Sequence, residues 1–64
     1  MRVKWASFST GQPFRGNTRM SLAEADGVTL DAQDMFLVVR DPQDSDPDPL
    51  IIPWHNVKHA KVAT

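Results

Sequence analysis

The side chains best suited to metal chemistry in this sequence are two histidines near its end. His55 and His59 are four residues apart, a spacing that places both on one side of a helix or of a strand. A protein metal site needs three or four ligands, and no third candidate lies close to them in sequence. We therefore expect one histidine to cap a turn or meet an acid, the other to be exposed, and no metal or other cofactor to bind.

The alternating aspartates Asp44, Asp46 and Asp48 look like the start of a calcium-binding loop. Counted from Asp44, such a loop needs a glycine at its sixth position and a glutamate at its twelfth. Those positions hold Pro49 and His55 instead. The pattern therefore predicts a solvated loop that can contact a cationic partner, and it argues against a calcium site.

Catalytic motifs are also missing from the sequence. It contains no cysteine, no glycine-rich phosphate loop and no nucleophile-elbow motif, which leaves the two histidines as the only ready general bases. Its eight acids fall mostly in predicted loops, where the burial that raises a carboxyl pKa is hard to achieve. We therefore expect a binding protein with no catalytic residues, and not an enzyme.

Charge is sorted along the chain, although the net charge is only −1. Residues 1–19 carry cations and no acid, residues 20–50 carry all eight acids against the single cation Arg40, and Lys58 and Lys61 follow. If the first and last strands are neighbours, their cations form one basic surface opposite an acidic one.

Such a basic surface would suit nucleic acid, with cations on phosphates and the rings of Trp5, Phe8 and Phe14 stacked on bases. The candidate residues are Arg2, Lys4, Arg15, Arg19, Lys58 and Lys61. The simpler interpretation places the aromatic side chains in the core and the cations in solvent, because a small domain needs its large side chains for packing. The net charge also favours this simpler interpretation.

Trp54 is the last side chain with a binding interpretation. Tryptophan is enriched at binding hot spots, so an exposed Trp54 beside a short turn would mark a recognition surface. The alternative is that Trp54 closes the bottom of the fold. The candidate protein-binding residues are Trp54, His55, Asp44, Asp46 and Asp48.

The length of 64 residues allows one domain, 1–64, with a small core and no disulfide to support it. Stability then comes from a well-packed core or from assembly with other chains, and both remain open. The longest apolar run, residues 35–39, is far shorter than the ~20 residues that span a bilayer. Residues 1–8 lack the apolar stretch of a signal peptide. We expect a cytoplasmic protein, with the virion as the alternative location, and no membrane partner.

The first elements that would position these side chains are a strand and a loop. Residues 2–8 alternate so that Val3 and Trp5 share one face, which predicts a strand. Residues 9–18 concentrate glycine, proline and asparagine, which predicts a loop with Phe14 turned inward.

Residues 19–25 place Met20 and Leu22 on one face, which predicts a second strand. The dipeptide at positions 26–27 is Asp-Gly, a strong hairpin signal, and it would pair this strand with Val28 and Leu30. The alternative is a short helix over 19–25, because the segment contains good helix formers and a capping-box spacing.

The second half of the chain predicts a buried strand and two further short strands. Residues 34–40 form an apolar, β-branched run typical of a central strand buried on both faces. Residues 41–49 contain three prolines and four aspartates and predict a disordered or mobile acidic loop. Residues 50–53 predict a short strand, 54–56 a tight turn and 57–62 a last strand.

This second half also resembles the closing strands of small SH3-like barrels. The order in LVVRDPQDSDPDPLIIPWHNVKHAKV is strand, variable loop, short strand, tight turn and final strand. The IPW followed by Val57 resembles the end of PRC-barrel domains, while DMFLVV with the later LIIPWHNVKHAKV resembles the second half of Sm-like RNA-binding proteins. The resemblance covers residues 34–62 and implies a topology only.

We therefore expect an all-β fold, a small SH3-like or Sm-like barrel of five or six short strands, with an α+β fold containing one short helix near 19–25 as the alternative. The expected function is that of a non-catalytic protein-interaction module: an accessory subunit, an inhibitor or a capsid-type decoration protein that docks on a larger protein or assembly. Nucleic-acid binding is the alternative function. A homo-oligomer formed through an exposed strand edge is a third hypothesis.

Overall fold

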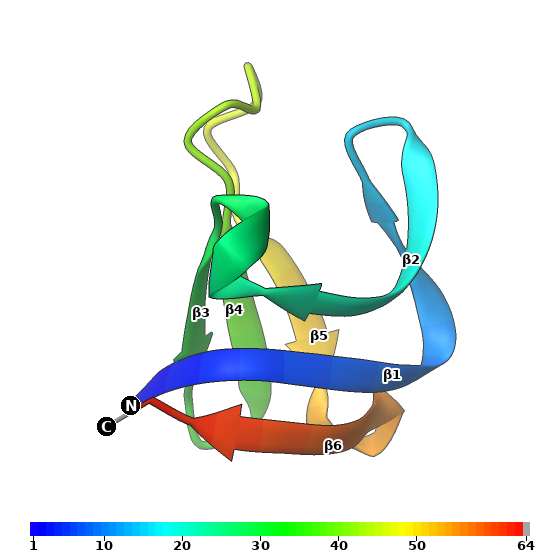
Figure 1. Ribbon diagram of the computed structural model, residues 1–64, viewed down its shortest axis with the longest axis vertical. Coiled ribbons are helices and arrows are strands. Elements are labelled where there is room, and N and C mark those ends of the chain that lie inside the picture. Colours follow the sequence, from blue (N-terminus) through cyan, green and yellow to red (C-terminus); the bar gives the residue numbers. More distant parts are fainter. Residues whose placement is uncertain (64) are drawn as a thin grey trace.

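The computed structural model describes residues 1–63 and is all-β, as the sequence predicts (Figure 1). Its six strands are β1 (Arg2–Phe14), β2 (Asn17–Ala23), β3 (Thr29–Ala32), β4 (Phe36–Arg40), β5 (Leu50–Pro53) and β6 (Val57–Val62). Two single 3-10 turns, η1 (Glu24–Asp26) and η2 (Trp54–Asn56), are the helical segments of the described chain. The alternative with a short helix over 19–25 is wrong, because β2 continues to Ala23 and η1 is one turn long.

All strand pairs are antiparallel, and the sheet order is β2-β1-β3-β4-β5 with β6 paired to β1. β1 therefore pairs with three strands, and the first and last strands are neighbours as anticipated. Figure 1 shows β1 and β6 running across the direction of β3, β4 and β5. The two groups of strands enclose the core between them.

The core consists of apolar side chains from both strand groups, and no polar side chain of residues 1–63 is buried. Its members are Val3, Ala6, Phe8, Leu22, Val28, Leu30, Leu37, Val39 and Ile52. β4 is the central strand, and its three consecutive residues Leu37, Val38 and Val39 are all buried. The centre of the predicted apolar run is therefore buried on both faces, whereas Met35 before the strand is 76% exposed.

A β-bulge in β1 changes which side chains face the core. Val3 is opposite Val62, but the next paired residue, Trp5, is opposite Lys61, so the register shifts between them. The extra residue leaves Lys4 and Trp5 both exposed, so the next residue after Val3 that faces the core is Ala6. The prediction that Val3 and Trp5 share a face is therefore wrong.

The predicted loop over residues 9–18 is also wrong, because β1 and β2 continue through it as one long hairpin. Only Arg15 and Gly16 form the turn, with positive φ angles of 50° and 80°, as a two-residue hairpin turn requires. Gly11 lies inside β1, where an added Cβ would be 2.3 Å from the Thr18 side chain. The glycines therefore permit a tight turn and a close approach within a hairpin. Phe14 packs against the core, as predicted.

The Asp26-Gly27 turn forms but does not make a hairpin. Gly27 has a φ of 83° and donates its N–H to the Glu24 carbonyl at 2.9 Å. The Asp26 carboxylate accepts the Ala23 N–H at 2.9 Å, which closes the 3-10 turn η1. Because η1 diverts the chain, β2 pairs with β1, and β3 pairs with β1 and β4. The predicted pairing of β2 with β3 is therefore wrong, and Met20 is 55% exposed.

The predicted last two strands and the tight turn between them are present. Residues 41–49 contain no strand or helix, β5 and β6 have the predicted bounds, and the predicted tight turn is η2. Within residues 1–63, no helix is long and apolar enough to cross a bilayer.

Substitutions of two adjacent isoleucines in β5 test which face of this strand packs in the core. Ile52 is fully buried in the core, whereas Ile51 is 45% exposed on the opposite face. We expect Ile52→Val to lower the free energy of unfolding by about 0.5–1.5 kcal/mol, because it removes a packed methylene. The matched control Ile51→Val should change it by less than about 0.5 kcal/mol. Urea unfolding followed by circular dichroism at low protein concentration measures both, and equal effects would contradict the assigned facing of β5.

Candidate functional site

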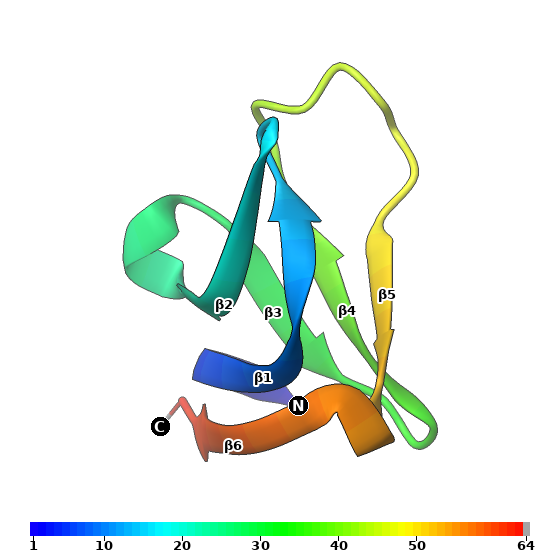
Figure 2. The same cartoon turned by 90° about the vertical axis from the view of Figure 1, so that its right-hand side faces the viewer.

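A concave region lies between the tip of the β1–β2 hairpin and the loop 41–49, which are both at the top of Figures 1 and 2. We call it the groove, and its volume is about 990 Å³. Its apolar lining comes from Phe14, Val39 and Leu50, which pack on or belong to the core. Its acidic lining comes from the loop residues Asp41, Asp44, Asp46 and Asp48. The groove therefore combines a hydrophobic part with a wall of carboxylates.

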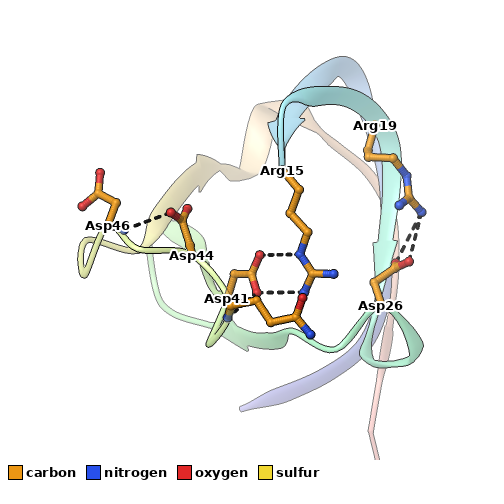
Figure 3. A network of polar contacts seen from close by, with 7 residues as sticks. Arg15, Arg19, Asp26, Asp41, Asp44 and Asp46 are labelled. Atoms are coloured by element: carbon orange, nitrogen blue, oxygen red, sulfur yellow. Dashed lines mark hydrogen bonds and ion pairs between the residues drawn. The ribbon is translucent and has the colours of Figure 1, made fainter.

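One ion pair connects the two sides of the groove. The Arg15 guanidinium donates from Nε to Asp41 Oδ2 at 2.7 Å and from Nη2 to Asp41 Oδ1 at 2.8 Å (Figure 3). The Asp41 side chain is only 10% exposed. Because these hydrogen bonds favour the ionised forms, they lower the pKa of Asp41 and raise the pKa of Arg15. The bidentate geometry fixes where loop 41–49 begins relative to the hairpin tip.

The Phe14 ring lies beside two guanidinium groups. The Arg15 Cζ atom is 4.6 Å from the ring centroid, and the Arg19 Cζ atom is 5.7 Å from it. Both distances are typical of cation–π contacts. Arg19 also pairs with Asp26, with an Nη2 to Oδ1 distance of 3.3 Å (Figure 3). Phe14 and the Asp41 carboxylate thus hold the Arg15 side chain between them, and Phe14 and the Asp26 carboxylate hold the Arg19 side chain in the same way.

The loop aspartates are held in place by hydrogen bonds to their own backbone. Asp44 Oδ1 accepts the Asp46 N–H at 2.9 Å (Figure 3), and Asp46 Oδ1 accepts the Asp48 N–H at 3.0 Å. Asp41 Oδ1 accepts the Gln43 N–H in the same way. Each of these turns uses one carboxylate oxygen. The Oδ2 atoms of Asp44 and Asp46 accept no hydrogen bond from the residues that the structure describes.

The structure separates the predicted protein-binding residues into two sets. Asp44, Asp46 and Asp48 line the groove, whereas Trp54 and His55 lie in η2 at the opposite end of the molecule (Figure 1). Trp54 is half-buried against the core, and its Nε1 donates to the Gln33 carbonyl at 2.9 Å. Trp54 therefore closes that end of the fold and does not form an exposed patch with the aspartates.

The predicted histidine contact with an acid is absent within residues 1–63. His55 and His59 are exposed and make no hydrogen bond or ion pair with the described side chains. The described residues also contain no cluster of three acids or histidines arranged to hold a metal ion.

The predicted nucleic-acid-binding residues are also split. Arg15 and Arg19 belong to the β1–β2 hairpin and are engaged by acids. The other four, Arg2, Lys4, Lys58 and Lys61, are exposed on β1 and β6. Of the three aromatic residues expected beside them, Phe8 is in the core and Phe14 lines the groove, which leaves Trp5 at 38% exposure. The single basic surface expected from the sequence is therefore smaller, and it lies on β1 and β6.

Sequence reasoning missed Phe14, Arg15 and Asp41 as partners in one site. Arg15 and Asp41 are 26 residues apart, and the hairpin that carries Arg15 was predicted to be a loop. The one local signal for Asp41 is its position between the end of β4 and a proline, where an aspartate often forms a turn of the kind seen at Gln43.

The Arg15–Asp41 pair predicts a specific dependence of stability on pH. The folded-state pKa of Asp41 lies below its unfolded value of about 3.9. Its stabilising contribution is therefore fully present above about pH 4 and is lost as the pH falls through the folded-state pKa. In Arg15→Gln, the Asp41 carboxyl should titrate at higher pH, close to its ordinary value. Carboxyl-carbon NMR titration measures this.

Arg15→Lys is the control for that titration, because lysine keeps the positive charge but cannot form the two-pronged contact. We expect its Asp41 titration midpoint to fall between those of the wild type and Arg15→Gln. A midpoint that is the same in all three proteins would show that the ion pair does not form in solution.

No family, curated protein or solved structure matches the chain in the three comparisons that were made. Three features of the described residues are suited to binding: the groove, the ion pair that spans it, and the cations of β1 and β6.

Proposed function

We propose that this protein is a non-catalytic protein-interaction module whose groove binds an extended, cationic segment of a larger protein. The observation that carries the proposal is the composition of the groove, in which Phe14 and Leu50 lie beside a row of aspartates. Asp44, Asp46 and Asp48 have no ion-pair partner within residues 1–63. An accessory subunit, an inhibitor or a decoration protein would dock through such a surface.

The internal Arg15 contact supports arginine as the preferred cation. Its guanidinium combines a bidentate hydrogen bond to Asp41 with stacking on Phe14. A partner's arginine or lysine would meet the next carboxylates along the loop, where one oxygen of Asp44 and of Asp46 is available. The same carboxylates repel phosphate groups, which favours a protein over a nucleic acid at this site.

Charge and apolar contact contribute differently to such a complex. Exposed carboxylates mainly raise the association rate and select the partner, while burial of apolar side chains supplies most of the affinity. The groove offers only a few apolar side chains. We therefore expect a dissociation constant on the order of micromolar, as in transient interfaces.

A peptide in which arginine and leucine alternate tests the proposal. Fluorescence anisotropy of the labelled peptide should show binding that weakens as salt rises. The triple variant Asp44→Asn, Asp46→Asn, Asp48→Asn should weaken binding by about tenfold or more, because asparagine keeps the turns but removes the charge.

The matched control is the double variant Glu24→Gln, Asp34→Asn, which removes two exposed acids outside the groove. It should bind the peptide nearly as well as the wild type. Equal losses in the two variants, or equal binding of a peptide that alternates glutamate with leucine, would refute the groove as the site.

We also propose that the architecture is a small SH3-like or Sm-like barrel. The order of β4, loop, β5, 3-10 turn and β6 supports this assignment, as does the pairing of the last strand with the first. The long hairpin of β1 and β2 and the sharing of β1 among three strands are consistent with it.

A second candidate function is nucleic-acid binding on β1 and β6. The observation that favours it is the pairing of Trp5 with Lys61, which places an exposed indole next to a lysine. Arg2, Lys4, Lys58 and Lys61 form no ion pair within the described residues. A stacking ring among such cations is the usual composition of a single-strand binding surface.

Mobility shifts with single-stranded RNA and DNA at low salt test this second function. We expect the double variant Lys58→Gln, Lys61→Gln to weaken binding and to lower the salt slope by about 2, since each lost phosphate contact lowers it by about 1. Arg40→Gln, which removes an exposed cation outside β1 and β6, is the control. No shift at low salt would dispose of this function.

A further inference from the structure

The outward face of the β3–β4–β5 sheet has a composition that the core does not explain. The strand register places Leu37 and Val39 of β4 on the inward face with the core residue Ile52 of β5. Successive residues of a strand alternate between faces. The outward positions of β4 are therefore Phe36, Val38 and Arg40, and those of β5 opposite them are Pro53 and Ile51.

Four of these outward residues, Phe36, Val38, Ile51 and Pro53, are apolar and adjacent, and we call them the apolar face. Val38 and Ile51 are directly opposite each other, as are Phe36 and Pro53. None of the four packs against the core cluster. Ile51 is 45% exposed and Pro53 is also exposed, whereas Phe36 is half-buried and Val38 is 7% exposed. A sheet with one face on the core normally carries polar side chains on the other.

The β3 side of the same sheet follows the normal pattern. Thr29 lies opposite Arg40, and Asp31 lies opposite Val38, so the outward positions of β3 are polar. Asp31 is held there by the N-terminal ammonium group at 3.0 Å and by Gln33. The apolar residues are therefore concentrated on β4 and β5, and this concentration marks an interaction surface.

Opposite charges lie at the two ends of β4, beside the apolar face. Arg40 is the last residue of β4, and Asp34 lies two residues before its start. Both are exposed, and neither forms an ion pair with the residues that the structure describes. The surface thus has an apolar centre with a cation at one end and an anion at the other.

Such a surface is complementary to a copy of itself. Consider a second copy related to the first by a twofold axis that crosses β4, with the two apolar faces in contact. Asp34 of each copy then lies near Arg40 of the other copy. A twofold interface requires this kind of self-matching patch. A partner of one charge sign would match only one end of β4.

We propose that two copies of the chain associate face to face through Phe36, Val38, Ile51 and Pro53, with Arg40 and Asp34 paired across the interface. Association through the sheet edges at β5 and β6 is less favourable. β5 contains Pro53 and follows Pro49, neither of which can donate a backbone hydrogen bond, and β6 carries Lys58 and Lys61. Of the six residues in the proposed dimer interface, Arg40 alone also lines the groove, so the dimer and the peptide site lie on largely different surfaces.

Sedimentation equilibrium from about 10 micromolar to about 1 millimolar tests the dimer. We expect the wild-type mass to rise toward twice the monomer mass. Ile51→Lys should raise the dissociation constant by about 30-fold or more, because it places a charge at the centre of the apolar face. Met20→Lys, which alters a 55% exposed residue on β2, is the matched control and should dimerise like the wild type.

A charge exchange tests the orientation of the two copies. Arg40→Glu alone and Asp34→Arg alone should each weaken the dimer, because like charges then meet across the interface. The double variant Arg40→Glu, Asp34→Arg should restore it. Circular dichroism of every variant at low concentration checks that the fold is retained. If Ile51→Lys does not fold, the variants at the exposed positions Arg40 and Asp34 still test the dimer.

Three results would overturn the proposal. They are a wild-type protein that stays monomeric over the whole concentration range, a Met20→Lys variant as impaired as Ile51→Lys, and a double charge exchange that fails to restore association. A monomeric wild type would leave the apolar face to a different protein.

Discussion

The pairing of β1 with three other strands is the constraint on which the remaining structure depends. The start of β1 joins β3, its middle joins β6 on one side and β2 on the other, and its end forms the hairpin with β2. One strand can serve three partners only if it bends and twists, and the register shifts in β1 are where it does so. The same pairing brings Lys61 beside Trp5 and carries Phe14 and Arg15 out to the hairpin tip. Both candidate binding surfaces therefore depend on the path of this strand.

The groove lies where the tip of the β1–β2 hairpin and the acidic loop meet. Arg15 and Asp41 fix one point of contact, and the prolines and aspartate turns of the loop limit its freedom beyond that point. Phe14, Val39 and Leu50, which belong to the core or pack against it, supply the apolar part of the groove. A cation from the protein itself neutralises the first carboxylate, and the later carboxylates have no such partner within residues 1–63. In the proposed complex, the cationic segment pairs with these later carboxylates.

β4 links the two proposed interaction surfaces. Its inward residues Leu37 and Val39 hold the core together, and Val39 also contributes to the groove. Its outward residues Phe36 and Val38 form the apolar face with β5. A strand in a sheet with one solvated face would alternate apolar with polar residues, whereas this one is apolar on both faces. In the proposed dimer, the outward face formed with Ile51 and Pro53 is covered by a second copy of the chain.

The sequence by itself determined the features that depend on neighbouring residues. These are the all-β class, the apolar central strand, the acidic loop, and the last two strands with the turn between them, because alternation, proline and aspartate act within a few positions. Only the tertiary structure decided the bulge that exposes Trp5, the continuation of the hairpin through residues 9–18, and the separation of β2 from β3 at Gly27. It also decided the contact of Arg15 with Asp41 across 26 residues. Strand pairing and ion pairs between distant segments are fixed by which faces can be buried together, and local residue patterns do not contain that information.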